Sequence, residues 1–137
     1  MGLRYPGLFH HIAALSPLTK PTYSYGSLKD LFGHQADLPS TIREHTPLWL
    51  LQNRVAARGV DLRLEVGQDD PAAADVRRFA ASARALGSGA LLVVRKGGHT
   101  FRFWRPALQE SVLWFGYGAQ QAAPGQFRLR DAGTATR

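Results

Sequence analysis

Cysteine is absent from the 137-residue sequence. Disulfide cross-links, thiolate metal ligands and cysteine nucleophiles are therefore excluded, and the redox compartment cannot be inferred from cysteine usage. The sequence also lacks any apolar run near the roughly 18 residues that cross a membrane, and its first residues lack the apolar segment of a secretory signal. We expect a soluble cytoplasmic protein without a membrane span, unless the true start of the chain lies elsewhere.

Acidic residues are outnumbered by basic ones, with 10 Asp and Glu against 17 Lys and Arg and a formal net charge of +7. An excess of this sign is common in proteins that bind nucleic acids or anionic surfaces. Here the arginines are scattered and no nucleic-acid-binding motif is recognised, so we expect no nucleic-acid partner. The hydrophobic content of 45% and the length are those of one soluble globular domain.

Three short segments have the composition of strands. Residues 11–17 form a small apolar run closed by a proline, and residues 60–66 alternate strictly between apolar and polar side chains. This alternation predicts a strand with one incompletely covered face rather than a central strand. Residues 90–94 are continuously apolar, which predicts a strand buried on both faces of a parallel sheet.

Helices are predicted between and after these strands. A proline near the start and a glycine at the end bound residues 48–58 and residues 71–86. A third helix is predicted where apolar residues recur at helical spacing, namely Trp104, Leu108, Val112 and Phe115. Strands that alternate with helices in this order predict an α/β fold with a parallel sheet of about three strands.

One domain is predicted over residues 1–118, followed by a polar C-terminal tail over residues 119–137. Within the domain, residues 18–58 are interpreted as a loop-rich insertion plus one helix. Loops above a sheet commonly shape ligand pockets, so this part of the chain is expected to lie over the site.

Residues capable of acid–base chemistry follow the second and third predicted strands. Asp69 and Asp70 come shortly after residues 60–66, and His99 lies in a glycine-flanked loop after residues 90–94. Parallel neighbouring strands bring such loops together at one sheet edge, where ligands bind in α/β proteins. A carboxylate that accepts a hydrogen bond from one imidazole nitrogen fixes the tautomer and leaves the other nitrogen free as a general base. An acid that precedes the histidine also matches the hydrolase order Ser, Asp or Glu, His.

Simpler roles remain open for both residues. Asp70 directly precedes Pro71 and would also serve as a helix N-cap, and His99 would also serve as a loop histidine bonded to a nearby carbonyl. No metal or cofactor is expected. The remaining histidines show no metal-ligand spacing and are interpreted as surface or packing residues: His10, His11, His34 and His45.

Three segments carry a resemblance to a known family. Residues 5–17 are similar to the stretch after a nucleophile helix, residues 64–70 resemble a Gly-x-x-acid segment, and residues 97–108 resemble a Gly-Gly-His segment. In this order, from about residue 2 to residue 117, they resemble the C-terminal part of the esterase family of α/β hydrolases. That family includes S-formylglutathione hydrolases, enterobactin esterases, feruloyl esterases and mycolyltransferases.

The resemblance implies roles for individual residues. Asp70 stands three residues after Gly67 and matches the triad acid better than Asp69 does, and His99 matches the general base. Phe101 stands where relatives often have tryptophan. The implied activity is hydrolysis of a small-molecule ester or thioester by acyl transfer through a serine, without a cofactor. The other aromatic side chains nearby are mostly expected in the core: Phe103, Trp104, Trp114 and Phe115.

The nucleophile of that family, a serine in Gly-x-Ser-x-Gly, has no counterpart in this sequence. Ser27 lacks the second glycine and the preceding strand, and Ser88 lies in a short turn. The N-terminal strands, the nucleophile elbow and the oxyanion donors would all precede Met1, so we expect a fragment of a serine carboxylic-ester hydrolase that is inactive alone. The alternative is a non-catalytic protein-interaction module that retains part of the hydrolase sheet. In both cases residues 12–15 would form an open apolar edge that favours self-association.

Overall fold

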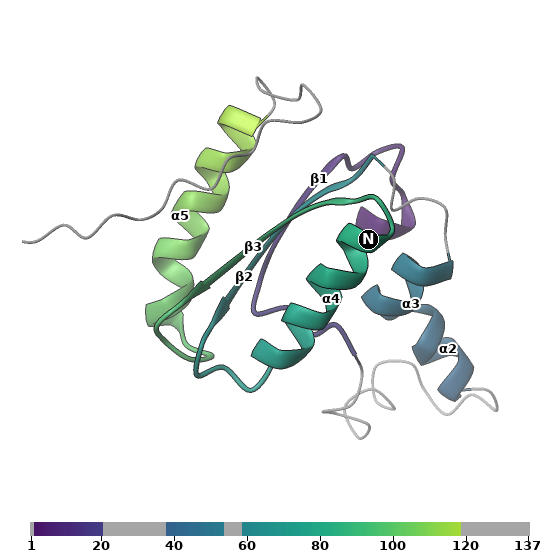
Figure 1. The fold of residues 1–137 in the computed structure, drawn as a ribbon, viewed down its shortest axis with the longest axis horizontal. Helices are drawn as coiled ribbons and strands as arrows, with labels where there is room; N and C mark the ends of the chain where they lie inside the picture. Colours follow the sequence, from purple (N-terminus) through teal and green to yellow (C-terminus); the bar gives the residue numbers. More distant parts are fainter. Residues whose placement is uncertain (1, 21–37, 54–58, 119–137) are drawn as a thin grey trace, which may run out of the picture.

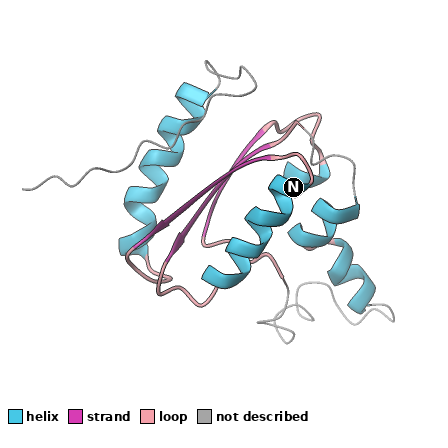
Figure 2. Cartoon of the chain, in the orientation of Figure 1, coloured by secondary structure: helices cyan, strands magenta, loops and turns pink. Residues whose placement is uncertain are grey.

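The computed structural model of the chain describes residues 2–20, 38–53 and 59–118. Its elements, in chain order, are η1 (Gly2–Arg4), β1 (His11–Leu15), α2 (Leu38–Glu44), α3 (Pro47–Asn53), β2 (Asp61–Gly67), α4 (Ala73–Ala85), β3 (Gly89–Arg95) and α5 (Phe101–Gly118). Figure 1 shows their arrangement, and Figure 2 separates helices from strands. The expected tail and much of the expected insertion lie outside the described residues, so both stay predictions.

The three strands form one parallel sheet in the order β1-β2-β3. Ala14, Leu64 and Leu92 are register partners across it. Helix α4 packs against β2 and β3 on one face, and α5 lies on the other face against β1 and β2 (Figure 1). The predicted α/β class and parallel sheet are confirmed. Since all three strands run the same way, the loops that follow them meet at one edge.

The hydrophobic core lies between β2 and α4. Leu62, Leu64 and Val66 share one face of β2, at the period of two that a strand imposes, and all three are buried. Fully burying one such side chain stabilises a fold by roughly 1.5–3 kcal/mol. This layer therefore holds β2, and the loop that follows it, in place. Helix α4 contributes buried residues at helical spacing: Val76, Phe79, Ala80 and Ala83.

Helix α2 lies within the segment predicted to be loop-rich, and the sequence analysis did not predict a helix at residues 38–44. Seven residues are too few for a clear periodic signal, and short helices owe their stability to tertiary packing. Here Ile42 provides that packing, since it is buried. In the helix that follows, the Thr46 hydroxyl accepts a hydrogen bond from the Trp49 N–H at 3.2 Å and acts as its N-cap.

The burial of two strands is the reverse of the prediction. β2 is the middle strand and is buried on both faces, including Arg63 and the fully buried Glu65. β3 was expected to be buried on both faces, yet it is an edge strand of the described sheet and is only half-buried. The prediction from alternating polarity was wrong for β2 because its polar side chains are covered by α5 and their charges compensate one another.

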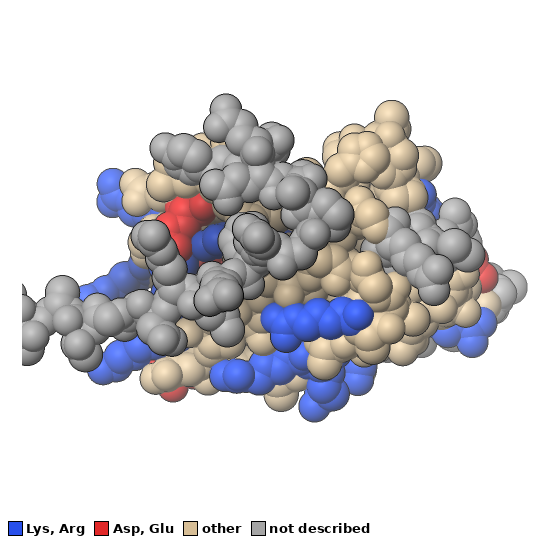
Figure 3. Space-filling view, turned by 45° about the horizontal axis from the view of Figure 1, so that its top comes forward, with Lys and Arg blue, Asp and Glu red and all other residues tan. Residues whose placement is uncertain are grey.

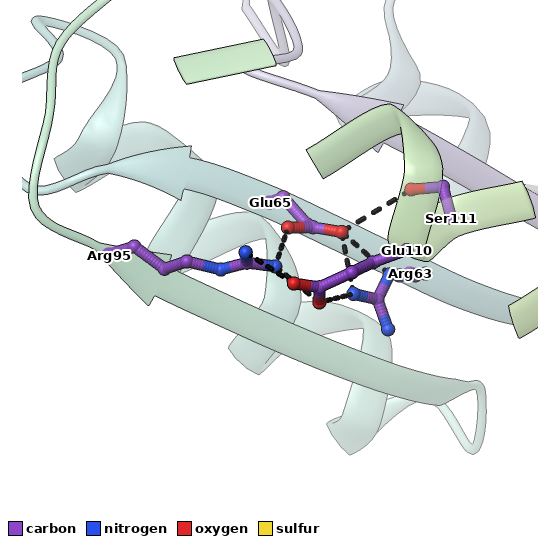
Figure 4. Close-up of polar contacts among 5 residues, drawn as sticks. All are labelled: Arg63, Glu65, Arg95, Glu110 and Ser111. Carbon is purple, nitrogen blue, oxygen red and sulfur yellow. Dashed lines mark hydrogen bonds and ion pairs between the residues drawn. The ribbon is translucent and has the colours of Figure 1, made fainter. Parts of the chain in front are cut away.

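Figure 4 shows the ion-pair network that covers this face of β2. Glu65 contacts Arg63 at 2.7 Å, pairs with Arg95 and accepts a hydrogen bond from Ser111 at 3.3 Å. Glu110 of α5 contacts both guanidinium groups, at 3.0 Å for Arg63 and 2.6 Å for Arg95. Buried charges are tolerated only when paired and hydrogen-bonded. The network therefore joins β2, β3 and α5 through two acids and two bases.

Helix α5 buries a different stripe from the one its spacing of large apolar residues suggests. Phe103, Ala107 and Ser111 face the sheet and are buried, which confirms the core position of Phe103. The side chains of Leu108 and Val112 are 57% and 60% exposed. Phe115, expected in the core, is also exposed, and Trp104 and Trp114 are half-buried. On this buried stripe, Ser111 donates a hydrogen bond to Glu65 at 3.3 Å.

Basic side chains on the face drawn in Figure 3 occur from one end of the molecule to the other. They are not gathered into a single patch there. Among the described helices, none is long and apolar enough to cross a lipid bilayer.

Candidate active site

The loop after β2 and the loop after β3 are held together by their main chains. Gln68 N–H donates to the Arg95 carbonyl at 2.8 Å, and Asp69 N–H donates to the Gly97 carbonyl at 3.0 Å. A Cβ atom at Gly67 would lie 2.1 Å from that same Gly97 oxygen. Only glycine permits this approach, which explains physically why a glycine stands three residues before Asp70.

Asp70 lies in the turn between β2 and α4, with a fully buried carboxylate. Its Oδ1 accepts the Ala72 N–H at 2.8 Å, and its Oδ2 lies 3.1 Å from Nδ1 of His99. The helix N-cap role left open by the sequence is not filled, because the N-cap residue of α4 is Ala72 and no side chain caps it. Oδ1 instead closes the turn before the helix, and Oδ2 makes the contact with His99 that the sequence predicted. Asp69 is exposed and lines a pocket of about 620 Å³ together with residues of the end of β3, the β3–α5 loop and the start of α5.

His99 follows Gly97 and Gly98 and precedes α5. Gly97 has φ of 136°, a value that side-chain-bearing residues rarely adopt, and it turns the chain after β3. The imidazole contacts a carboxylate rather than a carbonyl, and its side chain is 53% exposed. Because Nδ1 faces Asp70, Nε2 is the ring nitrogen left free to accept a proton. Within the described part of the chain, Nε2 has no hydrogen bond of its own.

The electrostatics of Asp70 combine opposing effects. Burial raises the pKa of the carboxyl, but hydrogen bonds from the Ser16 hydroxyl and the Ala72 amide and the proximity of His99 lower it. The net result is an Asp70 pKa below its ordinary value. The group is therefore a carboxylate at neutral pH, the form that accepts a hydrogen bond from Nδ1–H and stabilises an imidazolium.

Two further residues contact this pair and were not predicted as site residues. Trp104 donates its Nε1–H to Ser16 Oγ at 3.0 Å, and its ring meets the His99 ring edge-on, with centroids 4.7 Å apart and planes at 83°. Trp104 was expected in the core. A partly buried tryptophan usually finds a hydrogen-bond acceptor for its indole N–H. From this rule alone, a polar partner for Trp104 could have been predicted from the sequence, although not which residue it would be.

Of the two serines considered as nucleophiles from the sequence, Ser88 lies away from this pair. Ser88 donates to the Val60 carbonyl at 2.6 Å, at the opposite end of the sheet. The Ser16 hydroxyl is engaged by the Asp70 carboxylate and by the Trp104 indole. Ser27 lies outside the described residues. No three His, Cys, Asp or Glu side chains in the described ranges are grouped as a metal ion would require.

The remaining histidines make contacts elsewhere in the fold, are exposed, or lie outside the residues that the structure describes. His11 lies 3.7 Å from Asp61 and near Trp114, at the amino end of β1. His45 bonds Arg4 at 3.0 Å, His10 is exposed, and His34 lies in a range that is not described.

Comparison with known proteins gives matches in structure alone. No protein-family model and no curated protein matches the sequence. The chain is similar to a ferulic acid esterase, with 23% identity and a TM-score of 0.61 over 80% of this chain and 42% of that one. It is similar to S-formylglutathione hydrolase from Staphylococcus aureus, with 19% identity and a TM-score of 0.61 over 82% of this chain and 43% of that one. The chain spans less than half the length of either structure, and it has part of an α/β-hydrolase fold.

Proposed function

We propose that the chain is part of a serine carboxylic-ester hydrolase and supplies the acid, Asp70, and the general base, His99, of a Ser–His–Asp triad. The contact of 3.1 Å between His99 Nδ1 and Asp70 Oδ2 carries the proposal. It joins a buried carboxylate to a half-exposed imidazole at the carboxyl edge of a parallel sheet, where α/β proteins bind ligands.

Each residue has a defined task in this mechanism. Asp70 accepts the Nδ1–H bond and so favours the tautomer whose Nε2 lone pair is free. His99 Nε2 takes the proton of a serine hydroxyl as that oxygen attacks the acyl carbon. The resulting imidazolium, stabilised by the Asp70 carboxylate, then gives the proton to the leaving alcohol or thiol. Water attacks the acyl-serine by the same steps in a second cycle.

The nucleophile and oxyanion donors must come from outside this sequence. The sequence holds no Gly-x-Ser-x-Gly, and the loss of one oxyanion donor alone costs about 3 kcal/mol of transition-state stabilisation. We therefore expect the 137-residue chain to be inactive alone. In the described sheet β1 pairs with β2 only, so its other edge is open to a strand that would bring the serine beside His99.

The proposed substrate is a small-molecule ester or thioester. The two similar structures are a ferulic acid esterase and an S-formylglutathione hydrolase, so they span both classes. Serine acyl transfer treats both alike, because the acyl-enzyme is the same type of ester whichever atom leaves.

The DNA upstream of the codon for Met1 provides the test. We expect a Gly-x-Ser-x-Gly segment there, either in frame or in an adjacent reading frame whose product copurifies with this chain. The completed protein should hydrolyse p-nitrophenyl acetate, and His99→Ala should abolish that activity. Absence of such a segment within a domain's length, or full turnover by the His99→Ala form, would contradict the proposal.

A second candidate function is protein interaction without catalysis. This candidate is favoured by a stripe of exposed apolar side chains along α5, formed by Leu108, Val112 and Phe115. Single exposed apolar residues are common on protein surfaces, whereas contiguous apolar patches more often mark interaction sites. A defined dimer of the purified chain, weakened by Val112→Glu in sedimentation velocity, together with no ester hydrolysis by the completed protein, would support this candidate over the triad.

A further inference from the structure

We propose that Ser16 and Trp104 are positioning residues that hold the Asp70–His99 pair in its proton-accepting geometry. The catalytic meaning of this inference rests on the proposed function, whereas the contacts themselves do not. Ser16 follows β1, Asp70 follows β2, and Trp104 lies in the first turn of α5 after His99. The four side chains therefore close a ring across all three strand ends.

The ring is made of four contacts. Asp70 meets His99 at 3.1 Å, His99 meets the edge of the Trp104 ring at 4.7 Å between centroids, and Trp104 Nε1 donates to Ser16 Oγ at 3.0 Å. On the other side of Asp70, a hydrogen bond from the Ser16 hydroxyl lowers the pKa of the carboxyl. Each member of the ring thus has a neighbour on either side.

The direction of the hydrogen bonds is fixed by chemistry. An indole N–H only donates, so Ser16 Oγ must offer it a lone pair. The hydroxyl hydrogen is then left for the carboxylate, which in its charged form only accepts. Ser16, Ala72 and His99 therefore all direct donors at the Asp70 carboxylate. The Ser16 and Ala72 donors keep the carboxylate charged and in place, and a charged carboxylate facing Nδ1 accepts a hydrogen bond only from the Nδ1–H tautomer of His99.

Ser16 is held in an uncommon backbone conformation to make these contacts. Its φ is 46°, in the left-handed region, and it is 6% exposed. Its N–H donates to the Glu65 carbonyl at 2.7 Å, which fixes it to β2. A residue other than glycine in this region adds backbone strain, and such strain persists where the surroundings impose it. A hydroxyl at this position is the feature that glycine could not provide.

Trp104 adds a constraint that Asp70 cannot supply. The imidazole is 53% exposed, so one hydrogen bond alone would leave the ring able to rock about its Cβ–Cγ bond. The tryptophan edge limits that motion, and aromatic pairs in this arrangement attract one another beyond their buried area. A phenylalanine at position 104 would keep much of the packing but would lose the N–H that orients Ser16.

The test measures the tautomer of His99 in the purified 137-residue chain, labelled with ¹⁵N in the histidine rings. Spectra are recorded at about pH 8.5, two units above the ordinary histidine pKa of about 6.5, so that ordinary imidazoles are neutral. The His99→Ala spectrum assigns the His99 signals. The three test variants are Ser16→Ala, Ser16→Gly and Trp104→Phe. The matched controls are Ser88→Ala, which removes another buried hydroxyl, and Trp114→Phe, which removes another indole of α5.

We expect the ratio of Nδ1–H to Nε2–H tautomer at His99 to fall roughly 3- to 10-fold in the test variants, the range that one net hydrogen bond supports. Both controls should keep the wild-type ratio. Ser16→Gly accepts the left-handed backbone without strain, so a fall in both Ser16 variants assigns the effect to the hydroxyl. Trp104→Phe decides the matter if either Ser16 variant does not fold.

An unchanged ratio in folded Trp104→Phe and Ser16→Gly would overturn the inference, as would an equal fall in the two controls. The outcome is separate from that of the proposed function. A ratio that falls as expected, in a protein whose completed form hydrolyses no ester, would support the positioning ring and reject the esterase. An unchanged tautomer ratio, together with ester hydrolysis that depends on His99, would reject the positioning ring and support the esterase.

Discussion

Replacing Glu65 with glutamine removes the one fully buried charge of the ion-pair network while leaving the side chain's volume nearly unchanged. The network holds two carboxylates and two guanidinium groups, so Glu65→Gln leaves one uncompensated positive charge beneath α5. Breaking a buried ion pair from one side destabilises a protein by about 3–5 kcal/mol. The side chain of Arg95 is 30% exposed and is partly screened by water, so we expect the lower end, about 3 kcal/mol. A domain has only about 5–15 kcal/mol in total.

Urea unfolding followed by far-UV circular dichroism and tryptophan fluorescence measures this loss, by linear extrapolation of the unfolding free energy. Glu110→Gln is the matched variant within the network. Its side chain is 49% exposed, so about 1 kcal/mol or less is expected. Glu44→Gln, at an exposed position of α2, should stay within about 0.5 kcal/mol of wild type. If Glu65→Gln costs no more than Glu110→Gln, the reasoning that a compensated buried charge holds α5 to the sheet is wrong.

Three further predictions concern the site. The folded-state pKa of Asp70 lies below its ordinary value of about 3.9. Its contribution to stability is therefore complete above that value and is lost as the pH falls through the folded-state pKa. Acid unfolding of Asp70→Asn should lack this component, and identical pH profiles for the variant and the wild type would contradict the assignment. Gly67→Ala places a Cβ 2.1 Å from the Gly97 carbonyl oxygen and should destabilise the folded protein by about 1–3 kcal/mol or more. Gly7→Ala has open space around it and should leave the stability unchanged. Equal melting temperatures for the two variants would argue against the close approach at Gly67. In a completed form of the enzyme, His99→Ala should lower kcat for p-nitrophenyl acetate on the order of 10⁴-fold, and a loss under tenfold would remove His99 as the base.

The meeting of Asp70 and His99 could be predicted because it follows from topology alone. Two parallel strands that are neighbours in the sheet deliver the residues after them to one edge, and glycines 67 and 97 mark the turns where this happens. Sequence patterns of this kind are local, and they predicted the α/β class and the position of the site. Their function as a triad acid and base stays a proposal.

The contacts that sequence patterns missed are those between residues far apart in the chain. Ser16 and Trp104 are separated by 88 residues, and Glu65 and Ser111 by 46. No periodicity within one segment indicates a partner at that distance. The same limit explains the error on β2, whose polar side chains appear solvent-facing until the partners on α5 are known.

The main-chain contact at Gly67 has a consequence for how such a protein can change over evolution. The spacing between the loops after β2 and β3 is set by main-chain amides and a missing side chain, so the exposed side chains of these loops, such as Gln68 and Lys96, do not determine it. Those side chains can therefore be exchanged while the distance between the loops that carry Asp70 and His99 stays fixed.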